Sequence, residues 1–267
     1  MIKLSNKGKK ENLKVLLFFT NTIFKNRLPP DVFGATSAIF TTAHWSCYPR
    51  QHGLRMLAYS IARSIKKKKM ATDVKKIIDN LLAFYDFTNQ TIISVGAGGG
   101  QFIEYGRHAK SVFAVDNDQE ALVRLENNLQ KSQLAHKFTL IHSDFYQVNI
   151  KGDVVLFEFC LHEMENPEAA IRHAMTLAPN VIIADHSPCS EWAYIVDERE
   201  KVTTSTEAIA LFPVKKSQQH DSVQLFQSYN ELFQKVSVQG EKTIERIKDY
   251  KEQQDITIPM SYSFTQL

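Results

Sequence analysis

The sequence predicts an α/β protein with a doubly wound, mostly parallel sheet behind a helical N-terminal cap. Two observations carry this prediction. Short runs rich in β-branched residues alternate with amphipathic helical patterns, which is the order that βαβ crossovers produce. A cluster of glycines directly follows the first of these runs, where the chain of such a sheet turns tightly from strand to helix.

The expected domains are an N-terminal cap over residues 1–70 and the α/β domain over residues 71–267. Helical patterns cover about 11–27 and 54–67. The segment between them, 31–53, is irregular and rich in aromatic residues. It is expected either to cover a site as a lid or to pack permanently on the sheet.

The α/β domain is expected to begin with a helix over 72–85, whose apolar residues recur at three-and-four spacing. Two further helices are expected over 119–130 and 168–177. The expected strands cover 91–95, 112–115, 138–141, 153–157 and 181–184, and their continuous apolar runs are typical of strands buried on both faces. After residue 187 the pattern is mainly helical until a last strand over 256–264. Pro259 predicts an edge position or a bulge in that strand.

Composition excludes several classes of protein. The chain has 267 residues, of which 43% are hydrophobic and 23% charged, a balance typical of a globular protein with a sizeable core. Its three widely spaced cysteines predict neither a disulfide framework nor a CxxC metal motif. Apolar runs are too short to span a bilayer. These features predict a cytoplasmic protein without a membrane partner, and they leave the oligomeric state open.

Charge is divided unevenly along the chain. The first 90 residues hold 16 Lys and Arg against 5 Asp and Glu, whereas the rest of the chain holds 16 against 24. The clearest basic run is 66–69, four consecutive lysines. Clustered lysines bind nucleic acid through counterion release, but a solvated helix face has the same composition, and no aromatic residues interleave with these lysines for base stacking.

The strongest motif is the glycine cluster after the first expected strand. Gly96, Gly98 and Gly100 form a G-x-G-x-G loop, in which a backbone without side chains can approach a ligand closely. Asp116 ends the second expected strand, 20 residues after Gly96, where a carboxylate can accept both hydroxyls of a ribose. A dinucleotide fingerprint would need glycine at position 101, which is Gln101.

These motifs resemble the class I S-adenosylmethionine (SAM) methyltransferases over roughly residues 71–185. A polar segment at 142–145 follows the third strand, where the family places a residue against the adenine. Residues 153–167 resemble the family's fourth-strand segment, an Asp and an apolar strand followed by histidine and then a proline that starts the next helix. The resemblance implies a seven-stranded sheet, SAM as the cofactor and methyl transfer as the activity.

The resemblance also implies which residues hold SAM. They lie in the glycine loop, after the second and third strands and at the end of the fourth: Ser94, Gly96, Ala97, Gly98, Gly100, Asp116, Asn117, Ser143, Asp144, Phe145, Glu158 and Phe159. One position departs from the family pattern. The family often has Asp or Glu where this chain has Ser94, so the hydrogen bonds that fix the loop and the methionine amine must differ here.

The acceptor is expected beside the fourth and fifth strands, because ligands of such sheets bind at the carboxyl ends of the strands. Candidate catalytic bases are His162, Glu163 and His186, although each of them is equally compatible with a hydrogen-bonded structural role. Several acids and histidines gather here, but no pair has the spacing of a compact metal motif such as His-x3-His. The sequence therefore predicts no metal.

The most favoured acceptor is a small molecule. The first alternative is a nucleic-acid methyltransferase that uses the basic N-terminal region, although no Asn/Asp-Pro-Pro-Tyr motif follows the fourth strand to clamp a flipped base. A second alternative is a non-catalytic binding protein with a methyltransferase-like fold, which the serine at position 94 leaves open.

Overall fold

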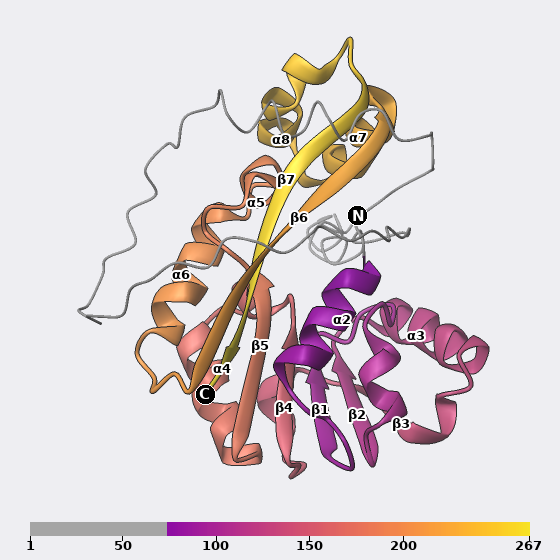
Figure 1. Cartoon of the computed structure of the whole chain (residues 1–267), viewed down its shortest axis with the longest axis vertical. Coiled ribbons are helices and arrows are strands. Elements are labelled where there is room, and N and C mark those ends of the chain that lie inside the picture. Colours follow the sequence, from indigo (N-terminus) through magenta and orange to yellow (C-terminus); the bar gives the residue numbers. More distant parts are fainter. Residues whose placement is uncertain (1–73) are drawn as a thin grey trace, which may run out of the picture. The chain divides into compact units, whose positions relative to one another are not determined.

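The computed structural model describes residues 74–267, drawn in colour in Figure 1. The expected N-terminal cap at 1–70, including its two helices and aromatic segment, lies outside the described residues. The boundary at residue 70 therefore stays a prediction. Within the described residues, no helix combines the length and the apolar character needed to cross a membrane.

One sheet organises the described residues, with strand order β3-β2-β1-β4-β5-β7-β6 (Figure 1). Five strands run parallel, and β7 and β6 are antiparallel additions at one side. The strands are β1 Thr91–Val95, β2 Ser111–Asp116, β3 Phe138–His142, β4 Val154–Glu158, β5 Asn180–His186, β6 Lys216–Ser228 and β7 Gln254–Gln266. This is the predicted seven-stranded, mostly parallel sheet.

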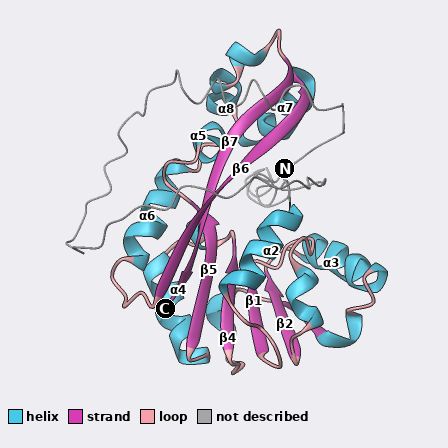
Figure 2. Cartoon of the chain, viewed as in Figure 1, coloured by secondary structure: helices cyan, strands magenta, loops and turns pink. Residues whose placement is uncertain are grey.

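Helices flank the sheet and connect its strands (Figure 2). They are α2 Val74–Phe84, α3 Gln119–Lys131, α4 Pro167–Leu177, α5 Glu191–Ile195, α6 Arg199–Ile209, α7 Tyr229–Val236 and α8 Glu241–Arg246. Short 3-10 turns are η1 Ile103–Arg107, η2 Ala135–Lys137, η3 Phe145–Gln147, η4 Leu161–Glu163, η5 Ser237–Gln239 and η6 Lys248–Tyr250. The predicted helices over 72–85, 119–130 and 168–177 are confirmed within two residues at each end.

Local sequence explains where the crossover helices begin. Asp118 caps α3 by accepting a hydrogen bond from the backbone N–H of Glu120. Asn166 caps α4 in the same way, accepting from the N–H of Ala169, and Pro167 occupies the first helical position. α3 therefore starts directly after β2, whereas α4 starts after the η4 turn that follows β4.

The central strands are apolar on both faces because helices cover both. On one face Ile92 and Leu156 pack with α2 and η1, while Ala114 packs against α3. On the opposite face Ile93 and Phe157 pack with α4. Successive residues of a strand point to opposite faces, so each of these strands contributes side chains to the apolar core on both faces of the sheet.

The expectation of mainly helical structure between 187 and 256 is wrong for β6. This strand is rich in Ser and Gln, and only Gln224 and Phe226 are fully buried along it. A polar edge strand of this kind lacks the alternation of apolar and polar residues by which a strand can be predicted from sequence. It exists because it pairs with β7 almost along its whole length, from Lys216 to Ser228.

The prediction for Pro259 is half right. β7 lies inside the sheet, between β5 and β6, and not at an edge. However, β5 pairs with β7 only from Tyr262 to Gln266, whereas β6 pairs with it from Gln254 onward. Pro259 therefore lies in the part of β7 that pairs with β6 alone. Figure 1 shows β6 and β7 continuing together beyond β5.

The projecting part of β6 and β7 depends on an aromatic contact near the end of β6. The ring of Phe226 stacks on that of the fully buried Trp192 in α5, with 5.8 Å between the ring centroids. We expect Phe226→Ala to lower the free energy of unfolding by about 3–5 kcal/mol, as large-to-small core substitutions do. Urea denaturation measures this. Leu211→Ala, at a side chain 63% exposed, should stay within about 0.5 kcal/mol of wild type; equal losses in both variants would contradict the account.

Candidate functional site

The three glycines after β1 have different structural reasons to be glycine. All have positive φ, of 68° at Gly96, 52° at Gly98 and 77° at Gly100. A Cβ on Gly96 would lie 2.5 Å from the Cβ of Cys160, and one on Gly100 would lie 2.6 Å from Leu125. Among the described residues, a Cβ on Gly98 would meet nothing closer than a backbone oxygen at 3.7 Å. Gly96 and Gly100 thus allow close packing, whereas no described residue blocks a ligand from approaching Gly98.

Asp116 is bound to the glycine loop. Its Oδ2 accepts a hydrogen bond from the N–H of Gly98 at 2.8 Å, and its Oδ1 accepts from the N–H of Asp118 at 2.9 Å. Burial raises the pKa of this carboxyl above its usual value, against the lowering effect of the backbone hydrogen bonds. The carboxylate is held at a fixed place beside the loop, with lone pairs left for a ligand.

The residues after β2 and β3 lie next to Asp116. Asn117 is exposed, and its carbonyl oxygen accepts a hydrogen bond from His142 at 3.1 Å. The N–H of Ser143 donates to the carbonyl oxygen of Asp116 at 3.1 Å. Asp144 is exposed but caps η3, and Phe145 is buried against Phe157. Of this group Asp144 and Asn117 offer the most accessible side chains.

Glu158 lies under the loop, bonded to the serine that replaces the usual acid. In the parallel register Ser94 pairs with Leu156, so Glu158, two residues farther along β4, points to the same face. Its Oε1 accepts hydrogen bonds from the hydroxyls of Ser94 and Tyr105, both at 2.5 Å. Among the described residues nothing donates a hydrogen bond to Oε2.

The surroundings of Glu158 are mostly apolar. It lies beside a narrow gap that is lined otherwise by Ile77, Leu81, Phe102, Phe159, Ala184 and Phe264. Burial raises the pKa of Glu158 to about 7, although the bonds from Ser94 and Tyr105 oppose the shift. The carboxyl therefore changes charge near neutral pH, at a position between the glycine loop and the end of β4.

Phe159 has a strained backbone at the same place. Its φ is 53°, in the left-handed region that costs a non-glycine residue of order 1–3 kcal/mol. Its N–H donates to the carbonyl oxygen of Ala184 at 2.7 Å, and its ring stacks on Phe102 at 5.5 Å. The turn that follows brings Cys160 against Gly96, where the Cys160 thiol donates to the carbonyl oxygen of Val95.

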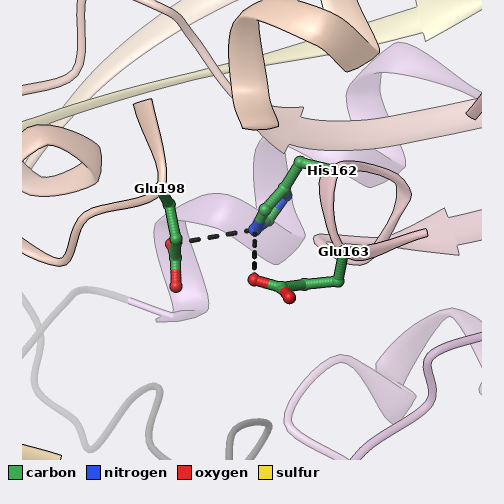
Figure 3. Close-up of side chains that lie close together, drawn as sticks. All are labelled: His162, Glu163 and Glu198. Atoms are coloured by element: carbon green, nitrogen blue, oxygen red, sulfur yellow. Dashed lines mark ion pairs between the residues drawn. The ribbon is translucent and has the colours of Figure 1, made fainter. Parts of the chain in front are cut away.

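A second polar group lies on the opposite face of the sheet edge, where Asp185 of β5 holds His162 of η4. Asp185 Oδ1 is 2.5 Å from His162 Nδ1. The other ring nitrogen, Nε2, is 3.6 Å from Glu163 Oε1 and 3.7 Å from Glu198 Oε2, and Figure 3 shows both carboxylates turned toward it. His162 and Glu198 are buried, and Glu163 is at the surface.

The two histidines of this group have opposite electrostatic environments. Burial alone would lower the pKa of His162, but Asp185, Glu198 and Glu163 outweigh it and raise the pKa to about 9. Burial lowers the pKa of His186 to about 4, and the nearby His162 adds to this. At neutral pH a proton-bearing His162 cannot accept another proton and His186 is a weak base, so neither suits the predicted role of general base without a change in its surroundings.

The structure thus places the sequence-predicted residues in two groups, and it adds residues that the sequence did not indicate. Ser94, Asp116 and Glu158 surround the glycine loop, while His162, Glu163 and His186 form the second group. The sequence gives no reason to single out Glu198, because acidic residues are common just before the first turn of a helix. Its side chain makes no cap for α6 and turns toward His162 instead.

Comparisons with known proteins agree with this geometry. Residues 93–180 match the family model described as a methyltransferase domain. The match covers a third of the chain and identifies a methyltransferase domain there, and the seven-stranded sheet with its β1 glycine loop has the class I methyltransferase fold.

Particular relatives are distant. The YcgJ protein of Bacillus subtilis has a similar solved structure, with a TM-score of 0.56 and 10% identity over 72% of this chain and 97% of that one. A proposed methyltransferase from Bacillus halodurans C-125 has a TM-score of 0.53 and 14% identity, with the same coverage. In sequence, the chain is 32% identical over 68 residues to the tRNA (guanine(37)-N(1))-methyltransferase Trm5b of Methanocaldococcus jannaschii. That match covers 26% of this chain and 20% of the relative.

The glycine loop gives a prediction about stability. Gly100→Ala should destabilise the protein by more than about 2 kcal/mol, for two reasons. The new Cβ would overlap Leu125, and the backbone there has a left-handed φ that alanine disfavours. Gly98→Ala should cost only about 1 kcal/mol, because only the left-handed φ opposes it. Thermal and urea unfolding of the two variants measure the difference. If Gly98→Ala were the more destabilising, the Cβ at position 100 would not be the tighter contact.

Proposed function

We propose that this chain transfers the methyl group of SAM to a small-molecule acceptor, with SAM bound along the β1 loop. The observation that carries the proposal is the hydrogen bond from the Gly98 N–H to Asp116, which joins a side-chain-free loop to a carboxylate at the end of the next strand. Asp116 would hold the ribose hydroxyls. Gly98 would lie against the amino-acid tail of SAM, with Ala97 and Gly100 shaping the loop.

Glu158 would take the place of the acid that the family often has at the position of Ser94. Ser94 and Tyr105 both bond to Oε1, so Oε2 is directed away from them and remains for the ammonium group of SAM. Phe159 would line the same part of the site. The adenine would lie toward Asp144 and Asn117, with Ser143 and the buried Phe145 supporting that end.

When bound, SAM supplies a methyl group already activated by its sulfonium. The protein then has to hold the acceptor in line with that methyl and to exclude water. We propose that His162, Glu163 and His186 form the acceptor side. His162, held in place by Asp185, and the exposed acid Glu163 would orient the acceptor.

A small molecule is favoured as the acceptor by the charge of the described residues. Residues 74–267 contain 18 Lys and Arg against 26 Asp and Glu, a net charge of −8 that repels a phosphate backbone. The second candidate is RNA. It is favoured by the similarity to a tRNA methyltransferase over 68 residues and by the 16 basic residues against 5 acidic ones in the first 90.

Methyl-labelled SAM distinguishes the two acceptors. The full chain is incubated with tritiated SAM and either the small-molecule fraction or the total RNA of a cell extract. We expect label in the small-molecule fraction and background label in RNA. Ribonuclease-sensitive label in RNA, with RNA retention that falls steeply with salt, would replace the proposal by the second candidate. SAM binding without label in either fraction would favour a non-catalytic binding protein.

The pH dependence of SAM affinity tests Glu158. Its pKa of about 7 means that the carboxyl is mostly protonated at pH 6 and mostly ionised at pH 8. Because the ionised form attracts an ammonium group, SAM affinity measured by calorimetry should rise about tenfold from pH 6 to pH 8. Glu158→Gln should flatten this rise, and Glu104→Gln, at a half-exposed acid of η1, should not. An unchanged profile in Glu158→Gln would remove Glu158 from the SAM site.

A further inference from the structure

Three side chains from two separate parts of the chain converge on one point beside the end of β4. They are His162 and Glu163 of η4 and Glu198, the residue before α6. Each offers one nitrogen or oxygen, and these three atoms all lie within 4.8 Å of one another (Figure 3). Imidazole nitrogen and carboxylate oxygen are ligands that divalent first-row transition ions accept.

Each of these side chains is held by a partner on the atom that points away from the common centre. Asp185 binds Nδ1 of His162 at 2.5 Å, which leaves Nε2 facing the centre. Lys201 donates to Oε2 of Glu163 at 2.7 Å, which leaves Oε1. Gln239 donates to Oε1 of Glu198 at 3.3 Å, which leaves Oε2. Partners that orient ligands from outside, above all a carboxylate on histidine, are the usual surroundings of a protein metal site.

The distances are close to those that a shared ion requires. Ligands about 2.1 Å from a tetrahedral ion lie about 3.4 Å apart. Here the distances from His162 Nε2 are 3.6 Å to Glu163 Oε1 and 3.7 Å to Glu198 Oε2. The Glu163 side chain is 30% exposed, so a small rotation of it can bring its oxygen to bonding position.

Glu198 provides an independent indication that something binds here. The residue is only 6% exposed, yet within residues 74–267 its buried Oε2 has no hydrogen-bond partner and is aimed at the centre. A buried carboxylate oxygen without a hydrogen bond is costly. With a neutral His162, the three carboxylates of Glu163, Asp185 and Glu198 outnumber the ammonium groups of Lys201 and Lys235 that act on them. A bound cation would offset the remaining negative charge.

We propose that His162 Nε2, Glu163 Oε1 and Glu198 Oε2 bind one divalent first-row transition ion, with Asp185, Lys201 and Gln239 orienting the ligands. This replaces the sequence-based expectation of no metal, which considered only spacing along the chain. Three protein ligands leave a coordination position for water or for an oxygen of the acceptor. The site goes beyond the proposed methyl transfer, because its occupancy depends on neither SAM nor an acceptor.

Metal binding by the full chain tests the proposal. The protein is stripped with a chelator, dialysed and titrated with ZnCl₂ or MnCl₂ by calorimetry, and bound metal is then counted by mass spectrometry after gel filtration. The wild-type chain should hold one more ion than Glu163→Gln or His162→Ala, or should bind it at least tenfold more tightly. Asp185→Asn should weaken binding about 10- to 100-fold by releasing the His162 ring.

Glu200→Gln is the matched control, since it removes an exposed carboxylate from the first turn of α6, two residues after Glu198. It should bind metal like wild type. Glu163→Gln tests the site even if a buried variant fails to fold, because Glu163 is at the surface. Equal metal content and affinity in wild type and folded Glu163→Gln would overturn the proposal and leave His162 as an ion-paired imidazolium. A failed methyl-transfer assay would not bear on this result.

Discussion

The site depends on how the end of β4 meets the glycine loop. Ser94 and Tyr105 both donate hydrogen bonds to Oε1 of Glu158, which ties β1, η1 and β4 together in an apolar environment. Two residues farther on, Cys160 packs so closely on Gly96 that no side chain fits there. The loop therefore cannot move independently of β4, and the carboxylate that faces it is fixed by bonds to one of its two oxygens.

This contact also explains how the chain accommodates a serine where related enzymes often carry an acid. The parallel register sets Ser94 beside Leu156, so the next side chain of β4 on that face, Glu158, reaches the serine hydroxyl. A carboxylate is thus present beside the loop, but it comes from the neighbouring strand. Its burial without a cationic partner among the described residues raises its pKa, which makes the local charge sensitive to pH near neutrality.

Much of the fold could be predicted because the buried strands and amphipathic helices bear strong periodic signals. β1 was predicted to the residue, and α4 differs only by including Pro167. β6 could not be predicted, since its stability comes from pairing with β7 and not from its own polar sequence. For the site, strand ends predicted the glycine loop, Asp116 and Glu158. They could not predict Glu198, which reaches His162 only because α6 folds back against η4.

The end of β4 separates two polar groups with different environments. Toward the glycine loop, Glu158 lies beside a narrow apolar gap. On the other face, His162 is surrounded by three carboxylates, two of them buried. Glu158 ends β4, and η4 with His162 and Glu163 follows after a short turn, so a few positions of the chain supply both groups. A binding site for an activated methyl donor and a site for a cation can therefore lie close together without sharing a ligand.

The most direct test of the account is a crystal structure with S-adenosylhomocysteine, the demethylated product of SAM. The account predicts that the ribose hydroxyls lie within hydrogen-bond distance of Asp116 and that the amino group lies beside Oε2 of Glu158, with the tail passing over Gly98. A ligand bound elsewhere, or one bound with Asp116 and Glu158 both out of reach, would contradict it.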